Sequence, residues 1–204
     1  MPLSAPKARR HLHTRTIQLE GFFREDGLFD IEAHIVDRKT YSYDSHWRGV
    51  VAAGHPVHDM WLRLSVDGDL VVREVEAAMD VQPYSLCSDI LDNFQRLVGL
   101  QVGAGWNRKV RERVGGVEGC THIAELLGPI ATVTFQTLAG DYPRELMGKP
   151  PRERGPDSGA QDDDAVFMIN GCYTWRSDGP VVRQDYPAYY TGEDAVKIVG
   201  EADS

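Results

Sequence analysis

The segment "GCTHIAELLGP", residues 119–129, brings together three side chains that could do chemistry: Cys120, His122 and Glu125. The apolar spacing that follows predicts that a helix begins here. The free amide groups at a helix start stabilise a thiolate, and His122 and Glu125 are three residues apart, so their side chains can meet on one face. A carboxylate that orients an imidazole commonly supports a base or a metal ligand. We therefore take Cys120, His122 and Glu125 as candidate catalytic residues, with core packing as the alternative role of the thiol.

A second group of polar residues stands in "GHPVHD", just before a predicted strand. His58 and Asp59 are neighbours and would point to opposite faces of that strand, so only one of them can face a site. His55 fits a polar loop. The candidate metal ligands are His58, Asp59, Cys87 and Cys120, a nitrogen, oxygen and sulfur set that suits zinc, although the sequence has no C-x-x-C pair.

Two hairpins must position these residues. Residues 16–43 alternate apolar and polar side chains around an Asp-Gly turn at 26–27, and residues 57–80 do the same around a second Asp-Gly turn at 67–68. The segment 44–56 between them is predicted to be a loop. The sequence thus predicts an antiparallel sheet of about four strands. One face of the third strand should be buried, namely Met60, Leu62, Leu64 and Val66.

Helical spacing replaces alternation after Pro83. One helix is predicted over 87–98, with Ser88 as its cap and Gly99 as its stop, and a short charged helix over "WNRKVRER". The last helix opens at Cys120, and Pro129 should kink or break it. The fold class is therefore α+β, with helices packed on one face of the sheet.

The ends of the chain differ in composition from the middle. "GKPPRERGPDSGAQDDDA" is rich in Pro, Gly and charge and should tolerate trimming, whereas the segment after it is aromatic and strand-like, with Cys172 expected in an aromatic core. The predicted organisation is a basic arm (1–15), an α+β domain (16–147), a flexible linker or loop (148–165) and a strand-rich tail that packs back on the domain (166–204).

Composition narrows the classes of function. The net charge of −9 argues against nucleic-acid binding, and the four cations of the arm are expected to pair with the chain's own acids or with a neighbouring subunit, as in a homodimer. No apolar run spans a membrane and no secretory segment opens the chain, which points to the cytoplasm. Three widely spaced cysteines do not suggest a disulfide framework. Without a dinucleotide fingerprint, a P-loop lysine or a G-x-S-x-G elbow, Rossmann enzymes, nucleotide kinases and common serine hydrolases are disfavoured.

The stretches "PLSAPKARRHLHTRTI", "EGFFREDGLFDIEAHIVDRKTY", "VHDMWLRLSVDGDL", "GCTHIAELLG" and "CYTWRSDGPVV" resemble the bacterial domain-of-unknown-function family 2889 over nearly the whole chain. That resemblance carries no activity. Members often neighbour genes for aromatic-acid breakdown, which implies a small-molecule role.

Residues 57–138 are also similar, in the order of their elements, to NifU-type scaffold proteins of iron–sulfur assembly. In that family ligands precede the first core strand, follow the last strand and open the final helix. The matching positions here are His58 or Asp59, Cys87, and Cys120. The first ligand is not cysteine and Cys87 lies several residues past the strand end, which puts a cluster that prefers thiolates in doubt.

Three functions follow as hypotheses. The first is an enzyme, a hydrolase or lyase, that acts on a small anionic metabolite (an aromatic acid or acyl compound) through a Cys/His/Asp cluster that could hold zinc. The second is a NifU-like sulfur or metal carrier that docks on a partner protein. The third is a non-catalytic accessory protein. A carrier needs exposed thiols, whereas an enzyme needs a pocket with converging polar groups.

Overall fold

The computed structural model describes residues 3–150 and 168–193. The chain divides into two compact units, residues 1–149 and 150–204. The larger unit holds an antiparallel sheet and the helices that follow it in sequence, so the α+β prediction is confirmed. Residues 151–167, which include most of the predicted linker, lie outside the described residues.

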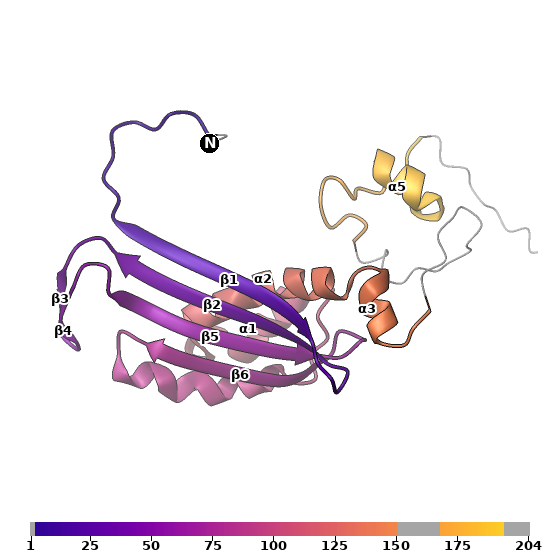
Figure 1. Ribbon diagram of the computed structural model, residues 1–204. Helices are drawn as coiled ribbons and strands as arrows, with labels where there is room; N and C mark the ends of the chain where they lie inside the picture. Colours follow the sequence, from indigo (N-terminus) through magenta and orange to yellow (C-terminus); the bar gives the residue numbers. More distant parts are fainter. Residues whose placement is uncertain (1–2, 151–167, 194–204) are drawn as a thin grey trace, which may run out of the picture. The chain divides into compact units, whose positions relative to one another are not determined.

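Four long strands form the sheet in the order β1-β2-β5-β6 (Figure 1). Both Asp-Gly turns close hairpins as predicted, and Gly27 adopts the positive φ of 88° that such turns require. The predicted loop instead contains a small hairpin, β3 (Tyr43–Ser45) and β4 (Gly49–Val51). The basic arm was predicted to end at residue 15, but the first strand already begins at His13. The long strands are β1 (His13–Phe23), β2 (Phe29–Lys39), β5 (Pro56–Val66) and β6 (Val72–Val81).

The helix-facing side of the sheet consists of cross-strand rows with one residue from each of β1, β2 and β5. Directly paired residues of antiparallel strands share a face, so each row is a layer of the core. The fifth row is polar and consists of Arg15, Asp37 and His58. The apolar core therefore ends at this row. The four apolar rows are Phe23–Phe29–Val66, Gly21–Ile31–Leu64, Leu19–Ala33–Leu62 and Ile17–Ile35–Met60.

The helices cover one face of the sheet (Figure 1). The longest, α2 (Thr121–Leu138), packs across β1, β2 and β5, while the 3₁₀ helix η1 (Ser85–Leu97) packs against β6. The approach of α2 to β1 is so close that a Cβ on Gly21 would lie 2.1 Å from Oγ1 of Thr137. The remaining elements of this unit are α1 (Trp106–Val114), η2 (Gly116–Glu118) and α3 (Asp141–Leu146).

The core lies between this helical layer and the sheet. Met60, Leu62 and Leu64 are buried as their alternation predicts, with at most 1% of each residue exposed. Ile90 on η1 packs against the core but keeps part of its surface exposed. Burial of these apolar residues is the main stabilising contribution to the unit.

Two helices differ in detail from the sequence prediction. The first begins at Ser85 rather than after Ser88, has Tyr84 as its N-cap and is a 3₁₀ helix. A kink or a break was predicted at Pro129, and the break does not occur: α2 runs continuously through this residue. Proline removes one backbone hydrogen bond, but the buried stripe of Ile123, Leu126 and Ile130 holds the helix against the sheet on both sides of that point.

The regular elements described in the smaller unit are two short helices, and turns make up most of the rest. The prediction of a strand-rich tail is wrong for residues 168–193, which form α5 (Pro180–Asp185) and the 3₁₀ helix η3 (Pro187–Tyr189). Each of these begins at a proline, which suits a first helical turn but cannot donate a hydrogen bond in a sheet. Cys172, expected in an aromatic core, is exposed, as is its neighbour Tyr173.

The other face of the sheet, which no helix of this unit covers and which we call the open face, carries ion pairs between strands. Arg63 on β5 pairs with Glu32 on β2 and with Glu76 on β6.

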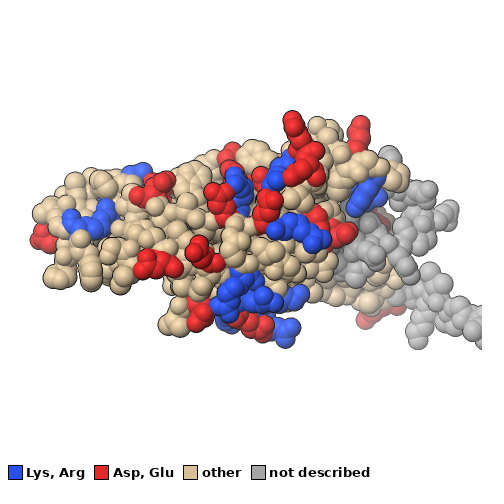
Figure 2. Space-filling view, turned by 90° about the horizontal axis from the view of Figure 1, so that it is seen from below, with Lys and Arg blue, Asp and Glu red and all other residues tan. Residues whose placement is uncertain are grey.

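A view from below shows acidic and basic side chains interspersed over the surface, with one gathering of Lys and Arg (Figure 2). Among the described residues, no helix has the length and apolar character needed to cross a membrane.

Candidate functional site

Asp37 lies at the centre of a polar cluster at the end of β2. Ile31, Ala33 and Ile35 face the helices, so the next residue in phase, Asp37, does too, and only 2% of it is exposed. The register between β2 and β5 shifts between Asp37 and Arg38, through a β-bulge or a similar irregularity. Bulges are common beside functional sites because they redirect side chains. A buried carboxylate is stable only if donors surround it.

Three side chains supply those donors. Nε and Nη2 of Arg15 donate to the two oxygens of Asp37, each at 2.8 Å. Nδ1 of His58 donates to Oδ2 at 2.9 Å, and Nε2 of His13 lies 3.1 Å from Oδ1. Arg15 also forms an ion pair with Glu125 of α2. The carboxylate therefore joins β1 to β5, and Arg15 connects both strands to α2.

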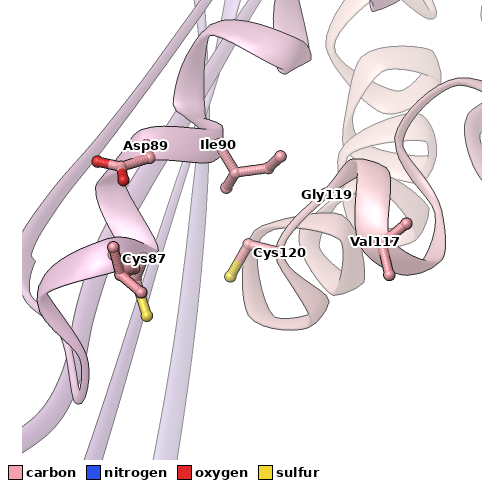
Figure 3. A pocket seen from close by; sticks show the side chains of 7 residues that line it. Cys87, Asp89, Ile90, Val117, Gly119 and Cys120 are labelled. Carbon is pink, nitrogen blue, oxygen red and sulfur yellow. The ribbon is translucent and has the colours of Figure 1, made fainter.

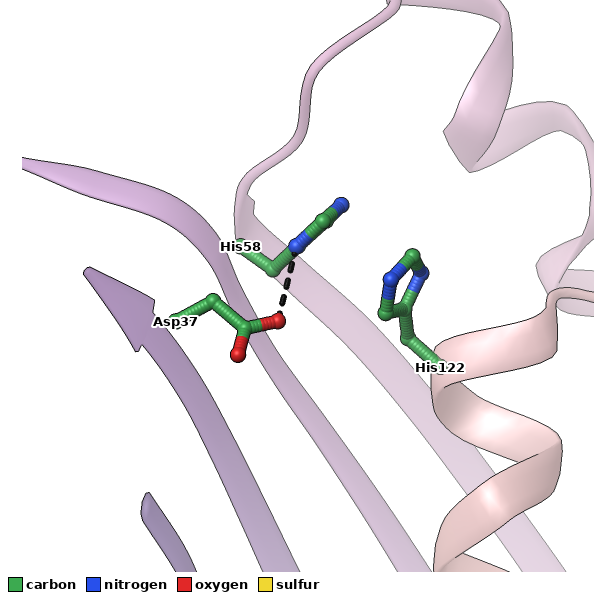
Figure 4. A group of neighbouring side chains, drawn as sticks. All are labelled: Asp37, His58 and His122. Atoms are coloured by element: carbon green, nitrogen blue, oxygen red, sulfur yellow. Dashed lines mark hydrogen bonds and ion pairs between the residues drawn. The ribbon is translucent and has the colours of Figure 1, made fainter. Parts of the chain in front are cut away.

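His122 completes the group from the first turn of α2. Its ring faces that of His58, with a centroid separation of 3.7 Å and a tilt of 31° (Figure 4). Because His58 donates its Nδ1 proton to Asp37, its Nε2 keeps a free lone pair in the neutral ring. We call Arg15, Asp37, His58 and His122 the Asp37 cluster.

The surroundings set the protonation states of these groups. Burial by itself would raise the pKa of Asp37, but hydrogen bonds from Arg15 and His58, with the charges of these groups, outweigh it and lower that pKa to about 2. Burial lowers the pKa of His58, and the neighbouring His122 lowers it further. Burial and the charge of Arg15 lower the pKa of His122. Near neutral pH the carboxylate is therefore ionised and both imidazoles are neutral.

Asp37, His58 and His122 could hold a metal ion. Each offers one ligand atom, and these atoms all lie within 4.8 Å of one another. Imidazole nitrogen and carboxylate oxygen are ligands of zinc and of other divalent transition metals. Both must be deprotonated to bind an ion, as they are here near neutral pH.

The two thiols predicted to act at the site lie beside the Asp37 cluster. Cys120 is the N-cap of α2, and its Sγ is 4.0 Å from Nδ1 of His122. Cys87, on η1, and Cys120 both line a pocket of about 350 Å³, and their sulfur atoms face the space between η1 and the start of α2 (Figure 3). Cys120 thus borders both the pocket and the cluster.

Two polar residues of the segment "GHPVHD", Asp59 and His55, lie away from the Asp37 cluster. Asp59 points to the open face of the sheet, opposite to His58, and its carboxylate accepts a hydrogen bond from Nε2 of His34 at 2.6 Å. His55 is exposed, and its Nδ1 is 3.2 Å from the carbonyl oxygen of Pro56. The predicted ligand set of His58, Asp59, Cys87 and Cys120 is therefore divided between two faces of the sheet.

Sequence reasoning did not identify Asp37, and it treated Arg15 only as a cation of the arm. The alternation of inward-facing and outward-facing residues along β1 and β2 could have identified both residues. Asp37 is in phase with the buried Ile35, and Arg15 is in phase with Ile17, so each continues an apolar face with a charge. The arm was expected to pair with the chain's own acids, and Arg15 does so with Asp37 and Glu125.

Comparison with known proteins identifies the family. No significant match to the chain was found among curated proteins or among solved structures, so the similarity to NifU-type scaffolds has no support there. The model of one family matches residues 13–136, a range that begins with β1 and contains the whole Asp37 cluster and both pocket thiols. Because that range is more than half of the chain, the protein belongs to the family described as "Protein of unknown function (DUF2889)".

Proposed function

We propose that this protein is a hydrolase or lyase that acts on a small anionic molecule. Its active site would contain a divalent transition-metal ion, with zinc as the first candidate, bound by Asp37, His58 and His122. The observation that carries the proposal is the convergence of three ligand atoms within 4.8 Å on the covered face of the sheet. These residues come from β2, β5 and α2, so a bound ion would connect the sheet to α2.

The protonation states support binding of an ion. The pKa of Asp37 is about 2 and the pKa values of both histidines are lowered, so protons compete weakly for these ligands near neutral pH. The two imidazoles would supply nitrogen ligands, and Asp37 would supply negative charge.

Charge supports an anionic substrate. The centre contains two carboxylates, Asp37 and Glu125, and one guanidinium, Arg15. A divalent ion would make the local charge positive and would attract an anion to a protein whose net charge is −9. Such an ion supplies Lewis acidity for a carbonyl group and acidifies bound water, which are the properties that hydrolases and lyases use.

Burial of the thiols favours an enzyme over a carrier. A sulfur or metal carrier must present its thiols to a partner, but Cys87 and Cys120 are both partly buried and line a pocket. The exposed thiol, Cys172, belongs to the other unit.

The test is a titration of metal-free protein with Zn²⁺ by calorimetry and with Co²⁺ by its visible absorption, in a background with all three cysteines changed to Ser. We expect one ion per chain. His58→Ala and His122→Ala should each weaken binding by more than about a hundredfold, because each removes a ligand. His34→Ala is the matched control, since His34 also pairs with an aspartate but on the open face, and it should bind as the parent does.

A parent protein that binds no ion would exclude the metal centre. So would unchanged binding in a variant that lacks both His58 and His122, because the ion would then be held elsewhere. Circular dichroism of each variant in the absence of metal separates the loss of a ligand from the loss of the fold.

A further inference from the structure

The pocket beside the Asp37 cluster has an apolar rim that faces solvent. Leu86 on η1 is 67% exposed and Val117 on η2 is 92% exposed, and Ile90 lines the wall between η1 and the core. The volume of about 350 Å³ is at the lower end of the range for small-molecule sites. Its polar lining consists of the two thiols and Asp89. An uncharged, apolar group fits these walls better than an anion does.

The walls of the pocket are held together by contacts outside it. Nδ2 of Asn93 on η1 donates to the carbonyl oxygen of Glu118 at 3.2 Å, and Arg96 forms an ion pair with the Glu118 carboxylate at 2.8 Å. These contacts fix η2 against η1. The opening is therefore bounded by connected elements, which favours a preformed binding site.

Cys120 stands where this pocket meets the cluster. Its Sγ is 4.0 Å from Nδ1 of His122, and an imidazole at this position can take the proton of a thiol. Figure 3 shows the same sulfur directed toward the pocket. A nucleophile, a base within reach and a cavity for the substrate are the components of acyl transfer through a thiol.

We propose that the pocket binds the apolar part of an activated acyl compound, an ester or thioester, and that Cys120 is the nucleophile that accepts the acyl group with His122 as its base. This step needs no metal ion. Only the second step, hydrolysis of the acyl-enzyme, rests on the function proposed above, because it uses water activated at the Asp37 cluster.

The chemistry balances as follows. Sγ of Cys120 attacks the carbonyl carbon while its proton passes to His122. A carbon–sulfur bond forms and the bond to the leaving alcohol or thiol breaks. The leaving group departs with the electron pair and takes the proton from His122, which becomes neutral again. Water then adds to the acyl-enzyme, the carbon–sulfur bond breaks, and a carboxylic acid and the free thiol of Cys120 are released.

The experiment uses full-length, metal-free protein with 4-nitrophenyl acetate and 4-nitrophenyl butyrate, read by nitrophenol release and by mass spectrometry of the intact protein and its peptides. We expect a burst of nitrophenol and one acyl group on Cys120. Each acylation rate is divided by the rate of the same ester with a free small thiol. This ratio should be higher for the butyrate than for the acetate, because the longer chain of the butyrate reaches the apolar wall. His122→Ala should slow acylation by about a hundredfold.

Two cysteine variants give matched controls. Cys120→Ser should lose the burst, whereas Cys172→Ser should keep it. Exposure alone predicts the opposite order, because Cys172 is exposed and Cys120 is partly buried. Leu86→Asp, a change at an exposed position on the rim, should remove the preference for the longer chain while acetylation continues.

The results separate this proposal from the proposed function. Acyl groups that collect on Cys172 or Cys87, with Cys120 unmodified in folded protein, would overturn the nucleophile assignment whether or not a metal binds. An acyl-enzyme on Cys120 that Zn²⁺ fails to hydrolyse would sustain the nucleophile and exclude the metal-assisted second step.

Discussion

Two histidine–aspartate pairs link β2 to β5, one on each face of the sheet. On the covered face, His58 donates to Asp37 at 2.9 Å, and on the open face His34 donates to Asp59 at 2.6 Å. Both pairs cross between the same two strands and use the same side chains. Hydrogen bonding alone does not distinguish them.

Their surroundings differ. The side chains of His58 and Asp37 are 12% and 3% exposed, and the His58 ring faces a second imidazole, His122. His34 instead stacks on Trp61, with ring centroids 3.6 Å apart. Burial beside a second ligand lowers the pKa of His58 and brings three ligand atoms together. A His–Asp pair therefore becomes a candidate site only where the fold adds a third group and removes water.

The largest difference between the faces is expected in apolar burial. Leu64 and Arg63 are neighbours on β5, but Leu64 is fully buried and Arg63 lies on the open face. Leu64→Ala should lower the free energy of unfolding by about 2–5 kcal/mol because it leaves a cavity. Arg63→Ala should cost less than about 1 kcal/mol, as expected for surface ion pairs. Urea denaturation measures both, and equal losses would mean that the two faces are wrongly assigned.

The second expected effect concerns the buried carboxylate. Arg15→Ala leaves Asp37 buried without its main partner, so the free energy of unfolding should fall by about 3 kcal/mol. That is the lower end of the range for such changes, because His13 and His58 still contact Asp37. The double variant Arg15→Ala/Asp37→Asn should recover part of the loss in the same assay. No recovery would show that Arg15 acts through packing rather than through the charge of Asp37.

The third effect is a dependence of stability on pH. Folding lowers the pKa of Asp37 from 3.8 to about 2, so its contribution is complete above about pH 4 and is lost as pH falls toward 2. The shift corresponds to about 2 kcal/mol. Folding also lowers the pKa of His58 and of His122 from 6.5, so stability should begin to decline below that pH, where the unfolded chain binds protons more readily.

Denaturation midpoints between pH 7 and pH 2 test this dependence. Asp37→Asn should flatten the profile below pH 4, and His58→Ala should reduce the decline that begins below pH 6.5. If both variants show the same slope as the parent protein, the groups that titrate lie elsewhere.

Most of the sheet followed from the sequence because its information is local. Asp-Gly turns fix where the hairpins reverse, and alternation fixes which residues face inward, as for Met60, Leu62 and Leu64. The helical tail was not predicted, because aromatic residues favour strands by composition while Pro180 and Pro187 set helix starts. The 3₁₀ geometry of η1 has no explanation in its residue pattern.

The candidate site was only partly predictable because it depends on strand register. His58, His122 and Cys120 were recognised as residues able to do chemistry. In the structure the ring of His122 contacts that of His58 on one side, and its Nδ1 lies near Sγ of Cys120 on the other. The partner of His58 depends on which residue of β2 lies opposite it, and the register of these two strands shifts directly after Asp37. Periodicity assigns a side chain to a face but does not select its neighbour across the strands.

The smallest effect is predicted for the open-face pair. His34→Ala removes a hydrogen bond to Asp59 and a stacking contact with Trp61. The Asp59 side chain is 19% exposed, so water can replace the lost donor, and Trp61 keeps the hydrogen bond from its Nε1 to Asp80 at 2.9 Å. The loss in the free energy of unfolding should therefore stay below about 1 kcal/mol. His58→Ala should cost more, since it leaves Asp37 buried with one donor fewer. Urea denaturation of both variants at pH 7 gives the comparison directly, and a His34→Ala loss equal to that of His58→Ala would show that burial does not distinguish the two pairs.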